Sequence, residues 1–162
     1  MTLEIERLLD ETGWQLLQEL QNNARLPYSE LGQRVGLSSP AVAERIHKME
    51  EAGIITAYRA EVNPSLLGLP ITAIMRMSVY AGESLARFTA LAKDIPEVME
   101  CYRVTGGDSY ILKIIVSTVE HLEALIDRLA AHGQVTTSIV LSAPVSKRIV
   151  TRELYMREQE RE

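Results

Sequence analysis

One predicted helix near position 45 has mostly polar residues on one side and apolar residues on the other. Ala41, Glu44, Arg45 and Lys48 follow one another at spacings of three, one and three, on one side of this helix, whereas Val42, Ile46 and Met49 share the other side. Arginine and lysine donate hydrogen bonds to phosphates and to base edges. A helix that is anchored by an apolar side and exposes a polar side suits insertion into the major groove of DNA.

The residues around this helix predict a helix-turn-helix over Tyr28–Ile55. Gly36 permits a tight turn, and we expect Ser39 to cap the second helix, with Pro40 at its first position. Gly53 is typical of a C-terminal cap, so the second helix should run from about Pro40 to Ala52.

Arg45 is the leading candidate for a contact to DNA, as a donor to a phosphate or a guanine edge. The alternative is a salt bridge to Glu44 or to an acidic residue of the first helix. The start of the second helix exposes N–H groups that suit a phosphate, although its residues could serve only as caps. The basic side chains of Arg34, His47 and Lys48 either reach phosphates or are simply exposed to solvent. The candidate DNA-binding residues are Arg34, Ser38, Ser39, Ala41, Glu44, Arg45, His47 and Lys48.

Composition and charge limit the possible classes of protein. The chain has 162 residues, of which 46% are hydrophobic, and no apolar run is long enough to cross a membrane. Without a secretory leader, we expect a cytoplasmic protein without membrane contact. The net charge is −5, and residues 1–60 hold six Lys or Arg against nine Asp or Glu. A monomer should therefore bind DNA weakly, and a dimer would double its contacts.

The segments on either side of the helix-turn-helix have different patterns. Apolar residues recur at helical spacing through residues 3–23, with an interruption at Gly13, so a helix should begin near Thr12 and end near Asn22–Asn23. Trp14 is expected to join the core below the helix-turn-helix. Ile54–Val62 has a β-like pattern, and it forms either a small wing or, as we favour, a linker, because no second strand follows within hairpin distance.

From Leu69 onward the pattern alternates between strands and helices. We expect strands at residues 71–80, 98–104, 110–116 and 135–141, with a helix around Phe88 after the first strand and another around Leu125 after the third. This order predicts an α+β protein with a ferredoxin-like βαββαβ domain. Both faces of the first and third strands carry bulky apolar groups, with Ile74 opposite Met75 and Ile111 and Ile115 opposite Leu112 and Ile114, so the face without helices would be an exposed apolar patch, and we expect a second copy to cover it.

Three segments together resemble the Lrp/AsnC, or feast/famine, family of prokaryotic transcription regulators. They are the stretch from Leu9 to Ile55, the stretch TAYRAEVNPSLLGL, and the stretch EVMECYRVTGGDSYILKIIV. The resemblance extends from about Leu9 to about Val145. It implies a helix-turn-helix domain at 1–60, a linker at 61–68, an effector-binding and oligomerisation domain at 69–145 and a charged tail at 146–162. The tail could cover a neighbouring subunit or fray in solvent.

The resemblance also implies partners. Members of the family bind double-stranded DNA, dimerise through their sheets, often assemble into octamers, and bind an amino acid near the loop that is Val104–Tyr110 here. Where the family often reads Gly-Asp-x-Asp-Tyr, this chain has Gly106-Gly107-Asp108-Ser109-Tyr110. The loss of two carboxylates predicts an altered or absent effector response. The candidate effector residues are Val104, Gly106, Gly107, Asp108, Ser109, Tyr110, Thr136 and Thr137, although a plain hairpin turn would use the same glycines.

The sequence offers no clear catalytic or metal site. The three histidines, at positions 47, 121 and 132, have no metal-site spacing, and Cys101 is expected to be a buried apolar residue. We therefore expect no enzyme activity and no cofactor apart from a possible amino-acid effector. Two alternatives stay open: an enzyme similar to the sirohaem decarboxylases, which resemble this architecture, and a protein that compacts DNA with little sequence preference.

Overall fold

The computed structural model describes residues 3–159, with side chains from 5 to 157. The ends of the predicted domain ranges, 1–2 and 160–162, lie outside these residues. The chain divides into two compact units, one formed by the residues up to Ala60 together with those from Val145 onward, the other by Glu61–Pro144. Each unit has its own hydrophobic core.

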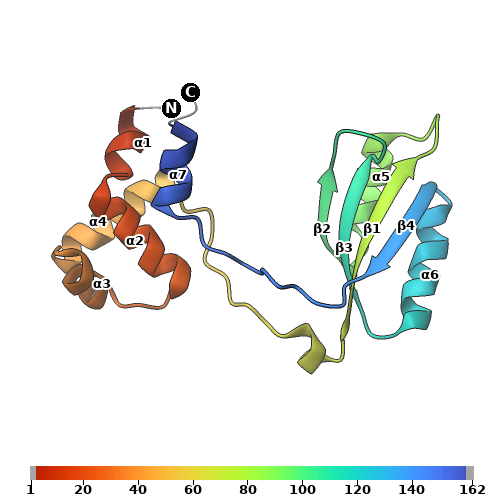
Figure 1. Ribbon diagram of the computed structural model, residues 1–162, viewed down its shortest axis with the longest axis horizontal. Helices are drawn as coiled ribbons and strands as arrows, with labels where there is room; N and C mark the ends of the chain where they lie inside the picture. The colour runs from red at the N-terminus through yellow and green to blue at the C-terminus, as the bar shows by residue number, and fades with distance from the viewer. Residues whose placement is uncertain (1–2, 160–162) are drawn as a thin grey trace. The chain divides into compact units, whose positions relative to one another are not determined.

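The first unit is helical (Figure 1). Its helices are α1 (Leu3–Leu8), α2 (Glu11–Asn22), α3 (Tyr28–Val35), α4 (Ser39–Glu51) and α7 (Arg152–Gln159). The turn between α3 and α4 contains Gly36 in the left-handed conformation, with φ 73°. The predicted helix-turn-helix is therefore present as α3 and α4.

The break in the N-terminal helical pattern lies earlier than we predicted. Asp10 caps α2 by accepting a hydrogen bond from the N–H of Gly13 at 2.8 Å, so Gly13 lies inside α2. A Cβ atom on Gly13 would lie 1.9 Å from the carbonyl oxygen of Leu8. Glycine at this position thus permits close packing of α1 on α2 and does not interrupt the helix.

The start of α4 also differs by one residue from the prediction. Ser38, not Ser39, is the N-cap, and its Oγ accepts from the N–H of Ala41 at 3.4 Å. The helix consequently runs from Ser39 to Glu51, with Pro40 in its first turn. Two adjacent serines both satisfy the capping preference, so the local sequence does not choose between them.

The side chains that anchor α4 are fully buried. Val42 and Ile46 pack with Leu16, Leu20 and Leu31, and Met49 belongs to an adjoining cluster. That cluster contains Leu8, Trp14, Leu17 and Met49, with Tyr155 of α7 packed against it. The predicted core role of Trp14 is confirmed.

Residues 54–63 form no strand, so the β-like pattern of Ile54–Val62 predicted the wrong secondary structure. No neighbouring strand is present in the described chain to complete its backbone hydrogen bonds, which a lone strand cannot satisfy by itself. There is thus no wing, and the segment connects the units as a linker. It is followed by the 3-10 turn η1 (Pro64–Leu67), which ends at Gly68 with φ 79°.

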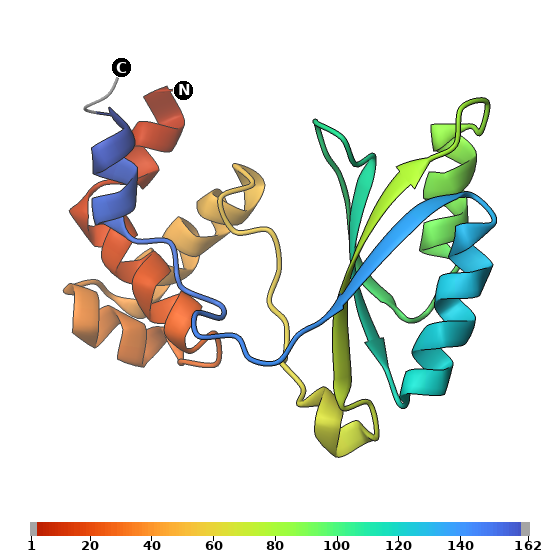
Figure 2. The ribbon, with the colours of Figure 1, turned by 45° about the vertical axis from the view of Figure 1, so that its right-hand side comes forward.

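The second unit is an antiparallel sheet with helices on one face (Figure 2). It comprises β1 (Ile71–Val79), α5 (Leu85–Lys93), β2 (Val98–Arg103), β3 (Tyr110–Val116), α6 (Val119–Ala130) and β4 (Gly133–Ile139). The strand order is β2-β3-β1-β4. This is the predicted ferredoxin-like plan, and the predicted third strand has the observed bounds.

The alternation in β1 and β3 separates the two sheet faces. Met75, which pairs with Leu112, is on the face packed against Phe88 of α5 and Leu125 of α6. Ile74, Ile111 and Ile115 fall on the opposite face. No helix of this unit packs on that face in the described chain, as the two views of the sheet illustrate (Figures 1 and 2).

The prediction for Cys101 is wrong, because this residue is exposed. It pairs with Leu112 in register but lies on β2, which is an edge strand of the sheet. The helices bury an edge strand less completely than a central strand. A residue on the helix-covered face of an edge strand can therefore still be exposed to solvent. The partial burial that remains raises the pKa of the Cys101 thiol.

Candidate nucleic-acid interface

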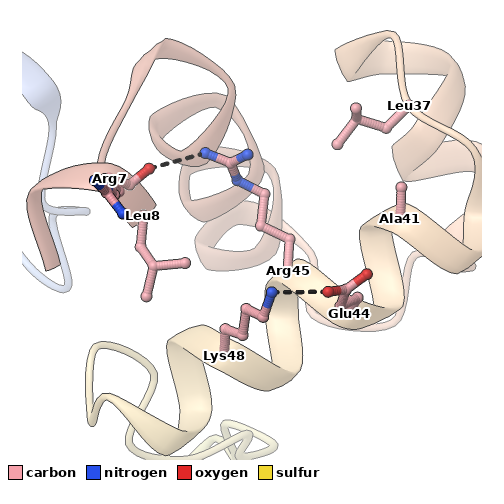
Figure 3. Close-up of a pocket in the computed structure, with 7 residues that line it drawn as sticks. All are labelled: Arg7, Leu8, Leu37, Ala41, Glu44, Arg45 and Lys48. Carbon is pink, nitrogen blue, oxygen red and sulfur yellow. Dashed lines mark hydrogen bonds and ion pairs between the residues drawn. The ribbon is translucent and has the colours of Figure 1, made fainter. Parts of the chain in front are cut away.

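A cavity of about 260 Å³ extends along the polar side of α4 (Figure 3). Four of the predicted DNA-binding residues line it together, namely Ala41, Glu44, Arg45 and Lys48. The other lining residues are Arg7 and Leu8 of α1 and Leu37 of the turn before α4. The structure therefore gathers the polar stripe of the helix on one concave surface.

Arg45 has two partners within the chain. Its guanidinium forms an ion pair with Asp10, the N-cap of α2, and Nη2 donates to the carbonyl oxygen of Arg7 at 3.3 Å. The Arg45 side chain is only 23% exposed, and its Nε is buried without a hydrogen-bond partner. These contacts connect α4 to the corner between α1 and α2.

The pKa of Asp10 reflects this arrangement. Burial by itself would raise the pKa of the Asp10 carboxyl, but the hydrogen bond from Gly13 and the guanidinium of Arg45 together lower it below its ordinary value. Asp10 is thus held as a carboxylate that caps α2 and pairs with Arg45. The sequence suggested an acidic partner for Arg45, and the structure identifies it as Asp10.

The exposed basic side chains of α4 lie beside carboxylates of the same helix. Lys48 Nζ donates to Glu44 Oε1 at 2.7 Å, and this hydrogen bond lowers the pKa of Glu44. His47 lies 3.3 Å from Glu51 and 3.8 Å from Glu50. Exposed pairs of this kind contribute little to stability and exchange readily with other partners.

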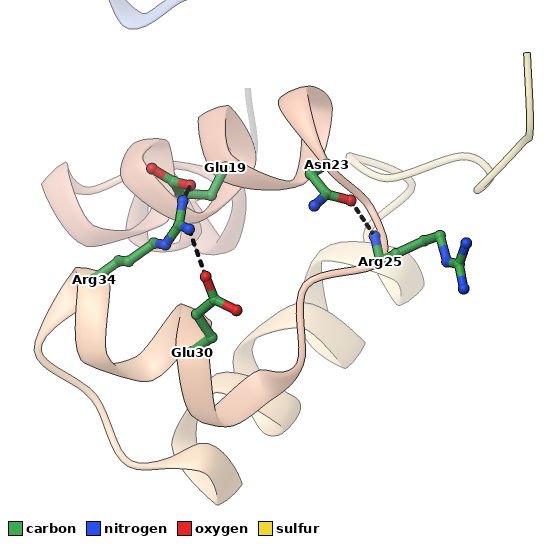
Figure 4. Close-up of polar contacts among 5 residues, drawn as sticks. All are labelled: Glu19, Asn23, Arg25, Glu30 and Arg34. Atoms are coloured by element: carbon green, nitrogen blue, oxygen red, sulfur yellow. Dashed lines mark hydrogen bonds and ion pairs between the residues drawn. The ribbon is translucent and has the colours of Figure 1, made fainter.

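Arg34 lies on α3 and does not line the cavity. It forms an ion pair with Glu19 of α2, and Nη2 donates to Glu30 Oε1 at 2.6 Å, so its pKa is raised above the ordinary value by these hydrogen bonds (Figure 4). Figure 4 also shows Arg25 in the loop before α3, with its side chain directed away from these carboxylates. Its backbone N–H donates to Asn23 Oδ1 at 3.0 Å.

Ser38 and Ser39 lie at the N-terminus of α4, next to the cavity residue Ala41. The Oγ of Ser38 already accepts from the N–H of Ala41, so this serine has a capping role. The first turn of α4 contains no acidic residue. An anion could approach the remaining N–H groups without repulsion from a carboxylate of that turn.

The predicted effector residues around Gly106 form the loop between β2 and β3. Gly106 has φ 113°, a conformation that L side chains rarely adopt, which explains the glycine. Side chains also hold the loop to β1: Ser78 Oγ donates to the carbonyl oxygen of Gly107 at 2.9 Å, and Ser109 Oγ accepts from the N–H of Val79 at 3.2 Å. Within the loop, the N–H of Val104 donates to the carbonyl oxygen of Ser109 at 3.1 Å.

The remaining predicted effector residues point in different directions. Tyr110 is buried, and its hydroxyl donates to the carbonyl oxygen of Leu85 at 2.9 Å, also lying 2.9 Å from Thr89 Oγ1. Thr137 pairs in register with the buried Met75, and its hydroxyl oxygen is buried without a partner. Thr136 pairs with Arg76 and is exposed on the opposite face. The two threonines therefore cannot face one ligand within a single chain.

Two arginines belong to these sites although the sequence did not assign them. Arg7 lines the cavity beside α4, and Arg76 lies 3.9 Å from Asp108 in the loop Val104–Tyr110. Both are visible in the sequence as charges, but only long-range packing shows that each lies beside its site.

The described residues include no cluster of His, Cys, Asp and Glu that could hold a metal ion. No helix in the described part of the chain has the length and apolar character needed to span a membrane.

Comparisons with known proteins match both units. Residues 9–50 match the AsnC-type helix-turn-helix domain, and residues 72–150 match the Lrp/AsnC ligand binding domain. An uncharacterized HTH-type transcriptional regulator of Bacillus subtilis, YezC, is 42% identical over 135 residues, which cover 83% of this chain and 95% of that protein.

Two solved structures are similar over most of the chain. LrpC of B. subtilis has a TM-score of 0.81 and 33% identity, covering 85% of this chain and 98% of the other. The regulator NMB0573 of Neisseria meningitidis, solved as a complex with L-Met, has a TM-score of 0.81 and 31% identity, covering 88% and 96%.

Proposed function

This chain belongs to the Lrp/AsnC family of helix-turn-helix transcriptional regulators, and we propose that it recognises a specific DNA sequence under the control of an amino acid. The helix-turn-helix is the DNA-binding domain, and the proposal concerns the residues that act and the molecule that regulates them. A cytoplasmic location, where the chromosome and free amino acids are both present, is part of the proposal.

One observation supports the choice of DNA-reading element above all others. Val42, Ile46 and Met49 are at most 1% exposed, while Ala41, Glu44 and Lys48 line a concave surface on the other side of α4. The helix is thus rigidly anchored and presents polar side chains to a partner. In this proposal Lys48 leaves Glu44 to meet a phosphate, and Arg45 holds the helix in position.

The effector site is proposed at the loop Val104–Tyr110. A free amino acid carries an ammonium and a carboxylate, and Asp108 and Arg76 offer opposite charges close together. The match to a ligand-binding domain and the L-Met complex of the Neisseria relative support an amino acid as the ligand class. Gly107 and Ser109, which replace two acidic residues of the common family pattern, leave Asp108 as the carboxylate of the loop.

The proposed assembly is a dimer through the open sheet face, with the effector site at contacts between dimers in a larger assembly such as an octamer. Ile74, Ile111 and Ile115 lie on this face, and Tyr102 of β2, which is 54% exposed, extends it. Burial of such side chains against a second copy removes apolar surface from water. The amino acid would then shift the population of assembly states and change the spacing of the DNA-binding units.

A mobility-shift titration tests the proposal. The full chain should bind DNA from upstream of its own gene more tightly than random DNA at moderate salt, and one amino acid should change that affinity. Absence of any preferred fragment would contradict sequence-specific regulation. Specific binding that no amino acid alters would remove only the effector.

The same titration addresses the alternative of a low-specificity DNA-compacting protein. That alternative predicts nearly equal affinity for upstream and random DNA. The enzyme alternative is not supported, because relatives that align with this chain over more than 90% of their length are named as transcriptional regulators.

A further inference from the structure

The cavity beside α4 has a second wall that does not belong to the helix-turn-helix. Arg7 and Leu8 of α1 form this wall, opposite the polar side of α4 (Figure 3). The polar side of α4 and α1 therefore face the same concave surface. The one basic side chain of α1 is Arg7, and the contacts of this side chain decide whether α1 can bind an anion.

Arg7 differs from the other cations of the cavity. Lys48 is paired with Glu44, and Arg45 is paired with Asp10. The Arg7 side chain is exposed, and in the part of the chain that the structure describes it has no ion pair or hydrogen bond. Arg7 can thus bind an anion without first giving up a carboxylate.

The backbone of Arg7 is fixed relative to α4. Its carbonyl oxygen accepts the hydrogen bond from Arg45 Nη2 at 3.3 Å. The next residue, Leu8, is buried in the cluster that contains Met49 of α4, and its carbonyl lies against Gly13 of α2. The guanidinium of Arg7 therefore extends from an anchored position at the cavity, not from a free chain end.

We propose that Arg7 binds a backbone phosphate of the DNA duplex that α4 enters, so that α1 is part of the DNA interface. This inference rests on the proposed function and adds a contact from outside the helix-turn-helix. An arginine fork matches the oxygens of a phosphate. A phosphate contact positions α4 on the duplex and carries no base preference.

The ionic-strength dependence of DNA affinity provides the test. Each phosphate contact contributes about 0.9 to the slope of log affinity against log salt concentration. The affinity of wild type and of Arg7→Gln for a random-sequence duplex is measured by fluorescence anisotropy between about 50 and 200 mM salt. The expected loss of slope in Arg7→Gln is about 0.9 per bound DNA-binding unit, hence about 1.8 for a dimer with both units bound.

Two control variants separate a contact from a general charge effect. Arg128→Gln removes the same charge from the exposed side of α6 in the other unit and should leave the slope unchanged. Arg7→Lys retains the charge and should keep most of the slope. The substitutions leave the carbonyl of Arg7 in place, and circular dichroism checks that α1–α4 remain folded.

The outcomes distinguish this inference from the proposed function. A wild-type slope in a folded Arg7→Gln variant would overturn the contact while leaving the regulator intact. An equal loss of slope in Arg128→Gln would also overturn it, because the effect would then be one of net charge. Failure of wild type to bind any duplex would overturn the proposed function itself, and with it this contact.

Discussion

At the scale of single residues, Arg45 shows how an expected DNA contact can have a structural task. Its guanidinium is paired with Asp10 and donates to the carbonyl of Arg7, so it connects α4 to both α1 and α2. A direct phosphate contact would need at least one of these partners to be released. We therefore expect Arg45 to act on DNA chiefly by holding α4.

Arg45 and Asp10 should contribute to the free energy of unfolding as an interacting pair. Arg45→Ala should lower the free energy of unfolding by about 1–2 kcal/mol and Asp10→Asn by about 0.5–1 kcal/mol, because asparagine still caps α2 but loses the charge. The double variant should cost less than the two single variants together. Urea denaturation measures all four proteins, and an Arg45→Ala variant as stable as wild type would show that Arg45 is not a structural link.

The contribution of Asp10 to stability should depend on pH. The folded-state pKa of Asp10 is below its ordinary value, so its contribution to stability is fully present above the unfolded-state pKa of about 3.9 and is lost as pH falls through the folded-state pKa. The difference between wild type and Asp10→Asn should thus be complete at pH 7 and shrink below about pH 4. A difference that grew toward acid would contradict this assignment.

At the scale of elements, the position of α1 depends on a glycine in α2. Gly13 lies where a Cβ atom would be 1.9 Å from the carbonyl oxygen of Leu8 and 3.1 Å from Cε of Met49. Backbone cannot yield as a flexible side chain does, so any larger residue displaces α1. Because α1 carries Arg7, this packing contact also bears on the DNA interface.

Gly13→Ala should therefore destabilise the helical unit. Alanine favours a helix over glycine by about 1 kcal/mol, but the clash with Leu8 should reverse this and give a net loss of about 1–3 kcal/mol. Gly107→Ala is the matched control, because no atom lies within 4 Å of the Cβ position there and it is not among the glycines with positive φ. Thermal unfolding compares the two variants, and a stabilised Gly13→Ala would refute the close-packing argument.

The C-terminal helix α7 is a second element that packs on the helical unit. The rings of Tyr155 and Trp14 have centroids 5.3 Å apart, and the side-chain amide of Gln21 exchanges two hydrogen bonds with the backbone of Val150, at 2.9 and 3.0 Å. The tail thus packs against its own chain. Neither possibility raised from the sequence, a neighbouring subunit or fraying, describes this contact.

Removal of the Tyr155 ring should be visible in fluorescence. Trp14 is the sole tryptophan of the chain, so Tyr155→Ala should shift its emission to longer wavelength and lower stability by about 1 kcal/mol. Arg157→Ala, a change on the exposed Arg157–Glu153 pair of the same helix, should alter neither signal. An unchanged Trp14 spectrum in Tyr155→Ala would mean that α7 does not pack there in solution.

At the scale of the whole molecule, the chain passes twice between its two units. It crosses near Ala60 and returns near Val145, so the DNA-binding unit is built from both ends of the chain. A change in the sheet-containing unit consequently has two covalent routes to the helical unit. The assembly of several chains would then depend on the open face of the sheet.

A charge on this face should prevent dimerisation without unfolding the unit. Ile111→Asp places a carboxylate in central strand β3, on the side away from the core, so it should yield monomers and weaken DNA binding. Ala124→Asp makes a similar change on the exposed surface of α6 and should leave the assembly unchanged. Light scattering distinguishes these results, and a dimeric Ile111→Asp would place the interface elsewhere.

The type and order of the elements could be predicted from the sequence because they depend on local periodicity. The alternation through β1 and the helical spacing of Val42, Ile46 and Met49 each reflect a single element with one buried side. The errors lie where burial or pairing depends on neighbours. Ile54–Val62 has no partner strand among the described residues, and Cys101 is exposed on the edge strand β2.

The sequence by itself determined the family, the helix-turn-helix, the ferredoxin-like plan and the polar stripe that includes Lys48. Only the tertiary structure decided that Arg45 pairs with Asp10, that Arg7 stands beside α4, and that α7 packs on Trp14. These contacts join residues that are distant along the chain. Local spacing specifies the faces of an element, but which faces meet depends on how the whole core packs, and that is not encoded at any one position.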